Sequence, residues 1–222
     1  MDIHADRVGI TIDHRSVIKD QTVHARAGEA LALVGPSGSG KTTLLNVMGL
    51  LRKPEFGSVT VGDADTARWK DGQRRRFWQR HAAFIFQDYG LIDEESVGYN
   101  VALSALAPFT HRARKHEWAV SAALERVGLD GRAREKVSRL SGGEKQRVGL
   151  ARAIFRGADV ILADEPTASL DAANRELVTT FLLAEASRGA TVVIATHDED
   201  LVSNCHRIHH LGARKADNQR VH

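Results

Sequence analysis

Two glycine-rich stretches of this chain carry the residue types that bind phosphate. The first, residues 35–42, fits the pattern G-x-x-x-x-G-K-[ST] and lies between an apolar run, Ala30–Val34, and a helical pattern over residues 41–51. Glycines let successive backbone N–H groups turn toward one phosphate, and the start of a helix adds positive charge. Lys41 supplies a compact cation for the β- and γ-phosphates, and the hydroxyl of Thr42 suits a magnesium ion. The predicted nucleotide-binding residues of this stretch are Gly35, Pro36, Ser37, Gly38, Ser39, Gly40, Lys41, Thr42 and Thr43.

The second stretch is residues 140–147, with the sequence Leu-Ser-Gly-Gly-Glu-Lys-Gln-Arg. Its pattern is that of another helix start that binds anions, with adjacent glycines that let the backbone approach closely. A nucleotide held by the first stretch would leave its terminal phosphate free to be capped by the second. The two stretches fit each other better across a dimer than within one molecule, so the sequence predicts a nucleotide site built from two chains.

An apolar strand pattern ends in two carboxylates, Asp164 and Glu165. Neighbouring residues of a strand face opposite sides, so the two side chains are expected to have different roles. Asp164 is placed to hold magnesium, directly or through water. Glu165 is placed to polarise the water that attacks a γ-phosphate.

Strand and helix patterns alternate around these residues. Short apolar strands are predicted at Ala30–Val34 and at residues 82–86, 159–163 and 191–195. An amphipathic helix over residues 174–188 separates the last two strands. This order predicts an α/β fold with a parallel sheet. Residues 88 to about 128 have a mostly helical pattern, which predicts a helical insertion.

Composition and charge narrow the class of protein. The 222 residues are 42% hydrophobic and 27% charged, which is ordinary for a globular domain. The formal net charge of +3 is too mild to indicate nucleic-acid binding. The single cysteine, Cys205, excludes an internal disulfide and a cysteine-based zinc cluster. Apolar runs fall far short of the roughly 20 residues that cross a bilayer, so membrane association is expected to depend on another component.

Together these motifs resemble those of the ATP-binding-cassette ATPases. Residues 140–147 are similar to the signature motif that separates this family from other phosphate-loop proteins. Gln87 falls where the family has its Q-loop, residues 169–171 resemble the D-loop, and His197 resembles the switch histidine. The resemblance implies an α/β fold: a phosphate-loop NTPase core with a mostly parallel sheet, an N-terminal antiparallel β portion and an inserted helical subdomain. It implies one domain, 1–222, with 1–87 and 156–222 as the core and about 88–155 as the helical subdomain.

The resemblance also implies ATP and Mg²⁺ as cofactors and a role for each motif residue. Glu165 is the water-activating base, and His197 contacts the γ-phosphate. The implied catalytic residues are Glu165, His197, Lys41 and Gln87, and the implied magnesium ligands are Thr42, Gln87 and Asp164. The signature residues implied to bind the nucleotide of the opposite subunit are Ser141, Gly142, Gly143 and Glu144. Asp171 is implied to link the two sites of a dimer.

The chain departs from the family where the adenine ring is expected to bind. The family usually places an aromatic residue on that ring shortly before the phosphate loop, but this chain has no Phe, Tyr or Trp before Phe56. His14 or Ile12 falls near that place. Stacking of a base on a full aromatic is worth about 1–3 kcal/mol, so its loss is expected to weaken ATP binding or blur base choice. We interpret His14 as a partial substitute.

Residues 86–101 resemble the branch of the family that includes lipoprotein-release, macrolide-efflux, haem-efflux and bacteriocin-export ATPases. By this resemblance the chain is expected to form a homodimer around ATP and to power a separate integral membrane permease that exports haem, lipoprotein, peptide or drug. It is expected at the cytoplasmic face of the cell membrane, with residues 87–99 lining the groove that receives the permease. Two alternatives stay open: a regulatory ATPase of cell-division type that controls a cell-wall enzyme through a membrane partner, and a soluble ATPase of DNA repair or translation.

A basic stretch, residues 74–80, has three interpretations. Its sequence, Arg-Arg-Arg-Phe-Trp-Gln-Arg, fits a solvated helix face or a contact with the membrane subunit or lipid headgroups. Arginines with interleaved aromatic residues also bind nucleic acid. No wider basic signal accompanies the stretch, so no nucleic-acid partner is expected.

Overall fold

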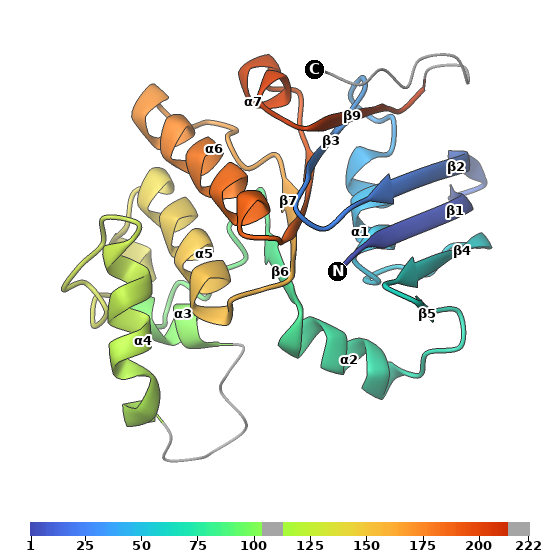
Figure 1. Ribbon diagram of the computed structural model, residues 1–222. Coiled ribbons are helices and arrows are strands. Elements are labelled where there is room, and N and C mark those ends of the chain that lie inside the picture. The colour runs from blue at the N-terminus through green and yellow to red at the C-terminus, as the bar shows by residue number, and fades with distance from the viewer. Residues whose placement is uncertain (104–112, 213–222) are drawn as a thin grey trace.

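The computed structural model contains a central sheet of five strands in which the neighbouring strands are parallel (Figure 1). The structure describes residues 1–103 and 113–212. The strands lie in the order β6-β7-β8-β3-β9, with the bounds Ala82–Ile85, Val160–Asp164, Thr191–Ala195, Ala30–Val34 and Arg207–His210. The expected α/β fold with a mostly parallel sheet is therefore confirmed.

Side chains of the central strands alternate between two hydrophobic cores. In β3, Ala30 and Ala32 belong to one core, whereas Leu31 and Leu33 belong to the other. Strands β7 and β8 alternate in the same way, because successive residues of a strand point to opposite faces of the sheet. Both faces are covered, which explains why these strands are nearly continuous apolar runs in the sequence.

Two helices cover one face of this sheet, and a helix with a second sheet covers the other (Figure 1). The first face carries α5, Gly142–Arg156, and α6, Ala172–Ser187. The second face carries α1, Lys41–Met48, and a four-stranded antiparallel sheet. The strands of that sheet, in the order β2-β1-β4-β5, are Arg15–Ala25, Ile3–Ile12, Phe56–Val61 and Ala64–Asp65. The expected N-terminal antiparallel portion is thus confirmed.

The insertion that follows β6 is only partly helical. Its helices are α3, Val97–Ala102, and α4, Ala113–Glu125, followed by a 3₁₀ turn, Val137–Arg139. Outside the insertion, α2, Asp71–Arg80, precedes β6, and α7, Glu199–Ser203, follows β8. Residues 87–96 form turns instead of the helical stretch expected there, because Tyr89 and Gly90 take left-handed backbone angles that interrupt a helix. Residues 104–112 of the predicted insertion lie outside the described residues. The boundaries expected between core and helical subdomain stay a prediction.

Other departures from the expected elements are short. Helix α1 ends at Met48 rather than at residue 51, because Leu50 takes a φ of +60°. A Cβ at Gly49 would lie 2.7 Å from the Phe84 ring, so only glycine lets the chain turn there against β6. The sequence patterns do not predict α7 or β9, which span only five and four residues and so give little periodic signal. Among the described residues, no helix combines the length and the apolar character needed to cross a membrane.

The basic stretch at residues 74–80 lies in α2 and is partly built into the fold. Arg74 and Phe77 are buried. Arg74 donates to three backbone carbonyl groups, including that of Leu50 at 3.4 Å, and the indole N–H of Trp78 donates to the carbonyl oxygen of Gly49 at 2.9 Å. Arg74 and Phe77 therefore hold α2 against the core and are not accessible to a partner. The role of the exposed arginines of this stretch stays a prediction.

Candidate nucleotide-binding and hydrolysis site

The glycine loop, residues 35–42, connects the carboxyl end of β3 to the start of α1. Gly40 precedes α1 with a φ of +94°, and a Cβ there would lie 3.1 Å from both the side chain and the carbonyl oxygen of Val17. The first turn of α1 has neither a side-chain cap nor an acidic residue, so its N–H groups suit a bound anion. The hydroxyl of Ser39 is buried and has no hydrogen-bond partner in the described part of the chain. Both features fit a loop that reserves polar groups for a ligand.

Lys41 extends across this loop. Its ammonium group donates to the carbonyl oxygens of Gly35, at 2.8 Å, and Pro36, at 3.3 Å. Both acceptors are neutral, so they hold the ammonium group over the loop without cancelling its charge. The predicted phosphate-binding lysine therefore lies where its loop can present it.

Thr42 and Asp164 meet at the edge of the sheet. The hydroxyl of Thr42 donates to Oδ1 of Asp164 at 3.0 Å. Partial burial raises the pKa of Asp164, the hydrogen bond from Thr42 opposes this effect, and the charge of Glu165 adds to it. A hydroxyl and a carboxylate are ligands that Mg²⁺ prefers, and a bound cation would stabilise the ionised carboxylate. The residues present therefore fit a magnesium ion.

Glu165 follows Asp164 but contacts a different partner. Its Oε2 lies 2.9 Å from Nδ1 of His197 and accepts the backbone N–H of His197 at 3.3 Å. Glu165 has a φ of +46°, a strained value for a residue with a side chain, and its N–H donates to the carbonyl oxygen of Ala195 at 2.8 Å. The side chain of His197 is 74% exposed. The carboxylate and the imidazole therefore form a pair on the open side of the sheet edge.

The parallel topology explains why these residues come together. They follow the carboxyl ends of β3, β7 and β8, which are neighbours in the sheet, and ligands of open α/β sheets bind at such ends. Gln87 follows β6 at the same edge and is exposed. Thr43, in the first turn of α1, is partly buried. Each of these predicted residues thus lies at or next to one edge of the sheet.

The signature segment begins α5 in a different way. The hydroxyl of Ser141 accepts the N–H of Glu144 at 3.4 Å, and the carboxylate of Glu144 accepts the N–H of Ser141 at 2.8 Å. Glu144 also accepts a hydrogen bond from Arg132, which is the main cause that lowers the pKa of Glu144 to about 2. A Cβ at Gly142 would lie 2.8 Å from the hydroxyl of Tyr89. Contacts within the same chain therefore fix the conformation of the signature segment.

Within one chain the two glycine-rich stretches do not bond to each other. No hydrogen bond or ion pair joins residues 35–42 to residues 140–147, both of which the structure describes in full. This separation agrees with the expectation that the stretches act across a dimer, which stays a prediction.

The D-loop residue Asp171 caps the start of α6 and contacts Asn174, which the sequence motifs do not single out. Its carboxylate accepts the backbone N–H of Asn174 at 2.8 Å and two further hydrogen bonds from the Asn174 amide at 2.9 Å. The amide oxygen of Asn174 accepts a hydrogen bond from Arg147. The Asp-x-x-Asn spacing was the available signal, because a residue that caps a helix faces the residue three positions later.

His14 lies in the turn between β1 and β2, with a φ of +61° and an exposed side chain. Its contact with adenine stays a prediction. Val17 and Ile18 of β2 pack against the phosphate loop beside Gly40. No motif marks these two residues in the sequence, because an apolar residue of a strand looks like any other core residue.

Comparison with known proteins decides the family. A family model described as "ABC transporter" matches residues 18–168. The chain belongs to the ABC transporter family. Among its relatives, the macrolide export ATP-binding/permease protein MacB of Burkholderia pseudomallei is 42% identical over 192 residues, which cover 86% of this chain and 29% of MacB. The probable syringafactin export ATP-binding/permease protein SyfD of Pseudomonas syringae pv. syringae is 40% identical over 191 residues, with the same coverages of 86% and 29%. This ABC cassette thus spans less than a third of the length of these relatives.

Solved structures of ABC cassettes have the same fold. A dimeric structure of MJ0796, a bacterial ABC transporter cassette, matches this chain with a TM-score of 0.85 and 30% identity over 94% of each chain. A dimeric post-hydrolysis state of MJ0796 bound to ADP and Pi gives a TM-score of 0.82, also at 30% identity and 94% coverage of each. The expected family, its fold and its ATPase class are confirmed. The roles of single residues stay predictions.

Proposed function

We propose that this chain is the ATP-hydrolysing part of an export system, in which it dimerises around ATP and powers a membrane permease. The observation that carries the proposal is the group of side chains at the carboxyl ends of β3, β7 and β8: Lys41, Thr42, Asp164, Glu165 and His197. Phosphoryl transfer depends on positioning and on stabilisation of charge, and this group supplies a cation, oxygen ligands for a metal and a base.

Different residues at the carboxyl edge of the sheet would hold the metal and the phosphates. Thr42 and Asp164 would hold Mg²⁺, with the amide oxygen of Gln87 as a further ligand. Lys41 and the N–H groups of the loop would hold the β- and γ-phosphates. Bound Mg²⁺ neutralises charge on the phosphates. The raised pKa of Asp164 supports this assignment, because its burial favours a counter-charge at that carboxylate.

Glu165 is the proposed general base, and His197 orients it. The imidazole Nδ1 lies 2.9 Å from the carboxylate. Glu165 takes a proton from the attacking water, while His197 contacts the γ-phosphate. The strained backbone of Glu165 supports a functional role, since residues held at such angles gather at active sites.

A second copy of the chain would complete each site. The signature segment makes no hydrogen bond to its own phosphate loop, and the related MJ0796 cassettes are dimeric. The residues proposed to face the γ-phosphate held by the partner copy are Ser141, Gly142 and Gly143. Glu144 positions Ser141, and Asp171 links the two sites.

Export is proposed because the relatives are named as macrolide and syringafactin export proteins. Haem, lipoprotein, peptide and drug remain the candidate cargo classes. The permease would hold the chain at the cytoplasmic face of the cell membrane. Ile92 and Tyr99 are 39% and 37% exposed within the proposed groove wall at residues 87–99, and exposed apolar side chains there support contact with a permease helix.

Complementation between two inactive variants tests the shared site. Lys41→Ala disables the phosphate loop, and Ser141→Arg blocks the signature segment. If each nucleotide binds between the loop of one chain and the signature of the other, a mixture of the two variants regains ATPase activity, because the mixed dimer contains one intact site. A mixture that stays as inactive as its components contradicts the proposal.

Co-purification and transport test the export role. The tagged chain, expressed in its native host, should carry with it a polytopic membrane protein, and vesicles that contain both should move cargo in the presence of ATP. The matched control is Glu165→Gln in the same vesicles. A cell-wall phenotype with no cargo movement supports the regulatory alternative instead.

A further inference from the structure

One side chain of α6 joins the two segments that the proposed dimer presents to the opposite nucleotide. The amide N–H groups of Asn174 donate to both carboxylate oxygens of Asp171, each at 2.9 Å, and its amide oxygen accepts a hydrogen bond from Arg147. Asp171 belongs to the D-loop, and Arg147 belongs to the signature segment. Asn174 therefore uses its donor on one motif and its acceptor on the other.

The same amide lies against the signature glycines. A Cβ at Gly143 would lie 2.8 Å from Nδ2 and 3.0 Å from Cγ of Asn174. Any residue with a side chain at that position would push α6 away from the start of α5. Gly143 and Asn174 therefore face each other with no room for a methyl group, and the D-loop and the signature segment are in register through packing as well as hydrogen bonds.

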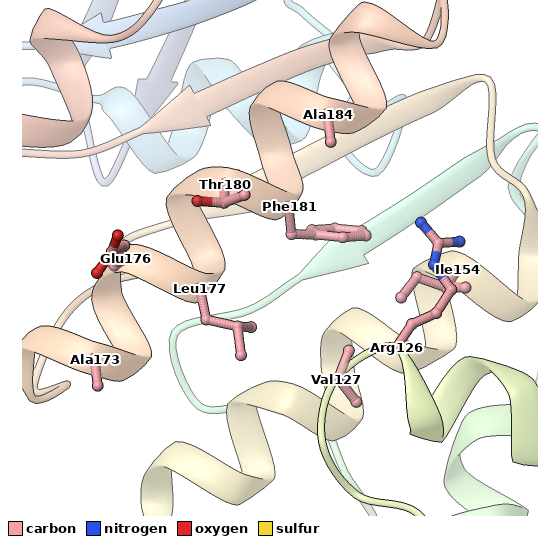
Figure 2. A pocket seen from close by; sticks show the side chains of 9 residues that line it. All are labelled: Arg126, Val127, Ile154, Ala173, Glu176, Leu177, Thr180, Phe181 and Ala184. Carbon is pink, nitrogen blue, oxygen red and sulfur yellow. The ribbon is translucent and has the colours of Figure 1, made fainter.

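Farther along α6, a groove of about 420 Å³ separates the helix from its neighbours (Figure 2). Leu177 and Phe181 of α6 line one side, and Ile154 of α5 and Val127 line the other. Near the two helix starts, the contacts at Asn174 join α6 to α5 directly. The buried amide of Gln146 in α5 also donates to the carbonyl oxygen of Pro166, in the loop before α6, at 2.9 Å.

We propose that Asn174 is a positioning residue for ATP hydrolysis. It fixes the D-loop relative to the signature segment of its own chain, so that both segments reach the nucleotide held by the partner copy. The inference rests on the proposed shared site. None of the hydrogen bonds that the structure describes for Asn174 goes to its own phosphate loop, so its effect is expected at the opposite site.

A carboxamide suits the position between Asp171 and Arg147 better than other side chains of its size. Aspartate would still accept a hydrogen bond from Arg147, but it would place a second carboxylate against Asp171. Leucine would offer neither donor nor acceptor and would leave Arg147, whose Nε is already buried without a partner in the described part of the chain, with less satisfied hydrogen bonding. Asn174→Asp therefore removes the side-chain hydrogen bonds to Asp171 and keeps the hydrogen bond from Arg147.

The test places Asn174→Asp in mixed dimers that have one active site. The Lys41→Ala chain supplies the signature segment and D-loop of that site, and the Ser141→Arg chain supplies its phosphate loop. Asn174→Asp on the Lys41→Ala chain should lower kcat by about tenfold or more with KM for ATP unchanged, because small misplacements of catalytic groups cost that much. On the Ser141→Arg chain, where it faces the dead site, the same substitution should leave the rate within about twofold.

Other outcomes are informative in different ways. An equal loss in both placements, or a loss in neither, overturns the inference and leaves the shared site intact. Parent variants that never regain activity on mixing overturn the shared site and the inference with it.

A control variant separates positioning from general loosening of α6. Arg126→Gln removes a contact of 3.4 Å between Arg126 and Glu185, away from both motifs, and should change neither placement. A loss with Arg126→Gln equal to that with Asn174→Asp overturns the inference. If Asn174→Asp does not fold, Asn174→Ser takes its place in the same two dimers.

Discussion

The starts of α1 and α5 are both glycine-bearing helix N-termini proposed to bind phosphate, yet their local hydrogen bonds differ. Helix α1 begins after Gly40, with no side-chain cap and no acidic residue in its first turn. Helix α5 begins after Ser141, which forms a reciprocal capping box with Glu144. The N–H groups of α1 remain available to an anion, whereas α5 already has a carboxylate bonded at its start.

The difference shows that a helix start can bind phosphate only through the backbone N–H groups that its own side chains do not already bond. In α5 the charge of Glu144 is balanced by Arg132, so a triphosphate from a partner chain meets a neutralised pair rather than a bare carboxylate. We therefore expect α1 to govern nucleotide binding by a single chain, and α5 to govern the steps that follow dimerisation.

Loss of the cation at α1 should have the largest effect. Lys41→Ala should reduce kcat/KM for ATP by about 100- to 1000-fold, because a preorganised charge on the transferred phosphate is removed. Steady-state ATPase assays and nucleotide titration of the monomer measure the change, with the exposed Lys53→Ala as the matched control. Near-normal affinity in the Lys41 variant would break the assignment of α1 as the phosphate site.

Glu165→Gln separates binding at α1 from the closure on α5. The rate of hydrolysis should fall by about 100-fold or more, since the general base is lost, while ATP affinity is retained. Sedimentation in ATP should then detect a trapped dimer. A variant that binds ATP and stays monomeric would count against the shared site.

A smaller effect is expected at the capped start of α5. Ser141→Ala should lower kcat by about tenfold, as one hydrogen bond to the γ-phosphate is lost, without altering ATP binding by the monomer. It should also cost about 1 kcal/mol of folding free energy through the lost cap. Ser138→Ala, in the exposed turn before the signature segment, is the control. Weaker ATP binding by monomeric Ser141→Ala would erase the difference between α1 and α5.

Substitutions of His14 test whether a contact with adenine adds to the nucleotide affinity that α1 provides. His14→Ala should weaken ATP affinity a few-fold and His14→Tyr should strengthen it, because a full aromatic contributes about 1–3 kcal/mol of stacking. Titration with ATP and GTP measures affinity and base choice together. Unchanged affinity in both variants would exclude His14 as the stacking residue.

The smallest expected effect is the pH dependence of the Arg132–Glu144 pair. The folded pKa of Glu144 is about 2, below its ordinary value of 4.5, so the pair stabilises the fold fully above pH 4.5 and its contribution is lost as pH falls toward 2. Urea unfolding of the wild type and Glu144→Gln should differ by about 1 kcal/mol or less near pH 6, because the pair is partly exposed. The difference should shrink toward pH 3, and a constant difference would mean that the charge of Glu144 is not responsible.

Residues in continuous motifs could be predicted, whereas contacts between motifs could not. The phosphate loop and the pair Asp164–Glu165 each follow a recognisable strand. The contacts of Arg147 with Asn174 and of Arg132 with Glu144 join residues 27 and 12 positions apart, and their pairing depends on how α5 packs in three dimensions.

In the fold, too, elements with a continuous sequence pattern could be predicted, and elements defined by distant contacts could not. Strands β3, β7 and β8 are apolar because both their faces are buried, so the sequence predicts them well. Strand β9 contains Arg207 and two histidines in four residues and pairs with β3 from a distant part of the sequence. Arg74 stands in a run of basic residues, and nothing in that run tells which arginine will find buried carbonyl groups.

The alternation of β3, β7 and β8 between two cores has a consequence for hydrogen exchange. A shift of any of these strands would disturb packing on both faces at once, so their amides should exchange with solvent only through global unfolding. Loops at the strand ends lack that double restraint. Deuterium uptake should therefore change on ATP binding at the loops while these strands stay constant, giving each experiment an internal reference within the same molecule.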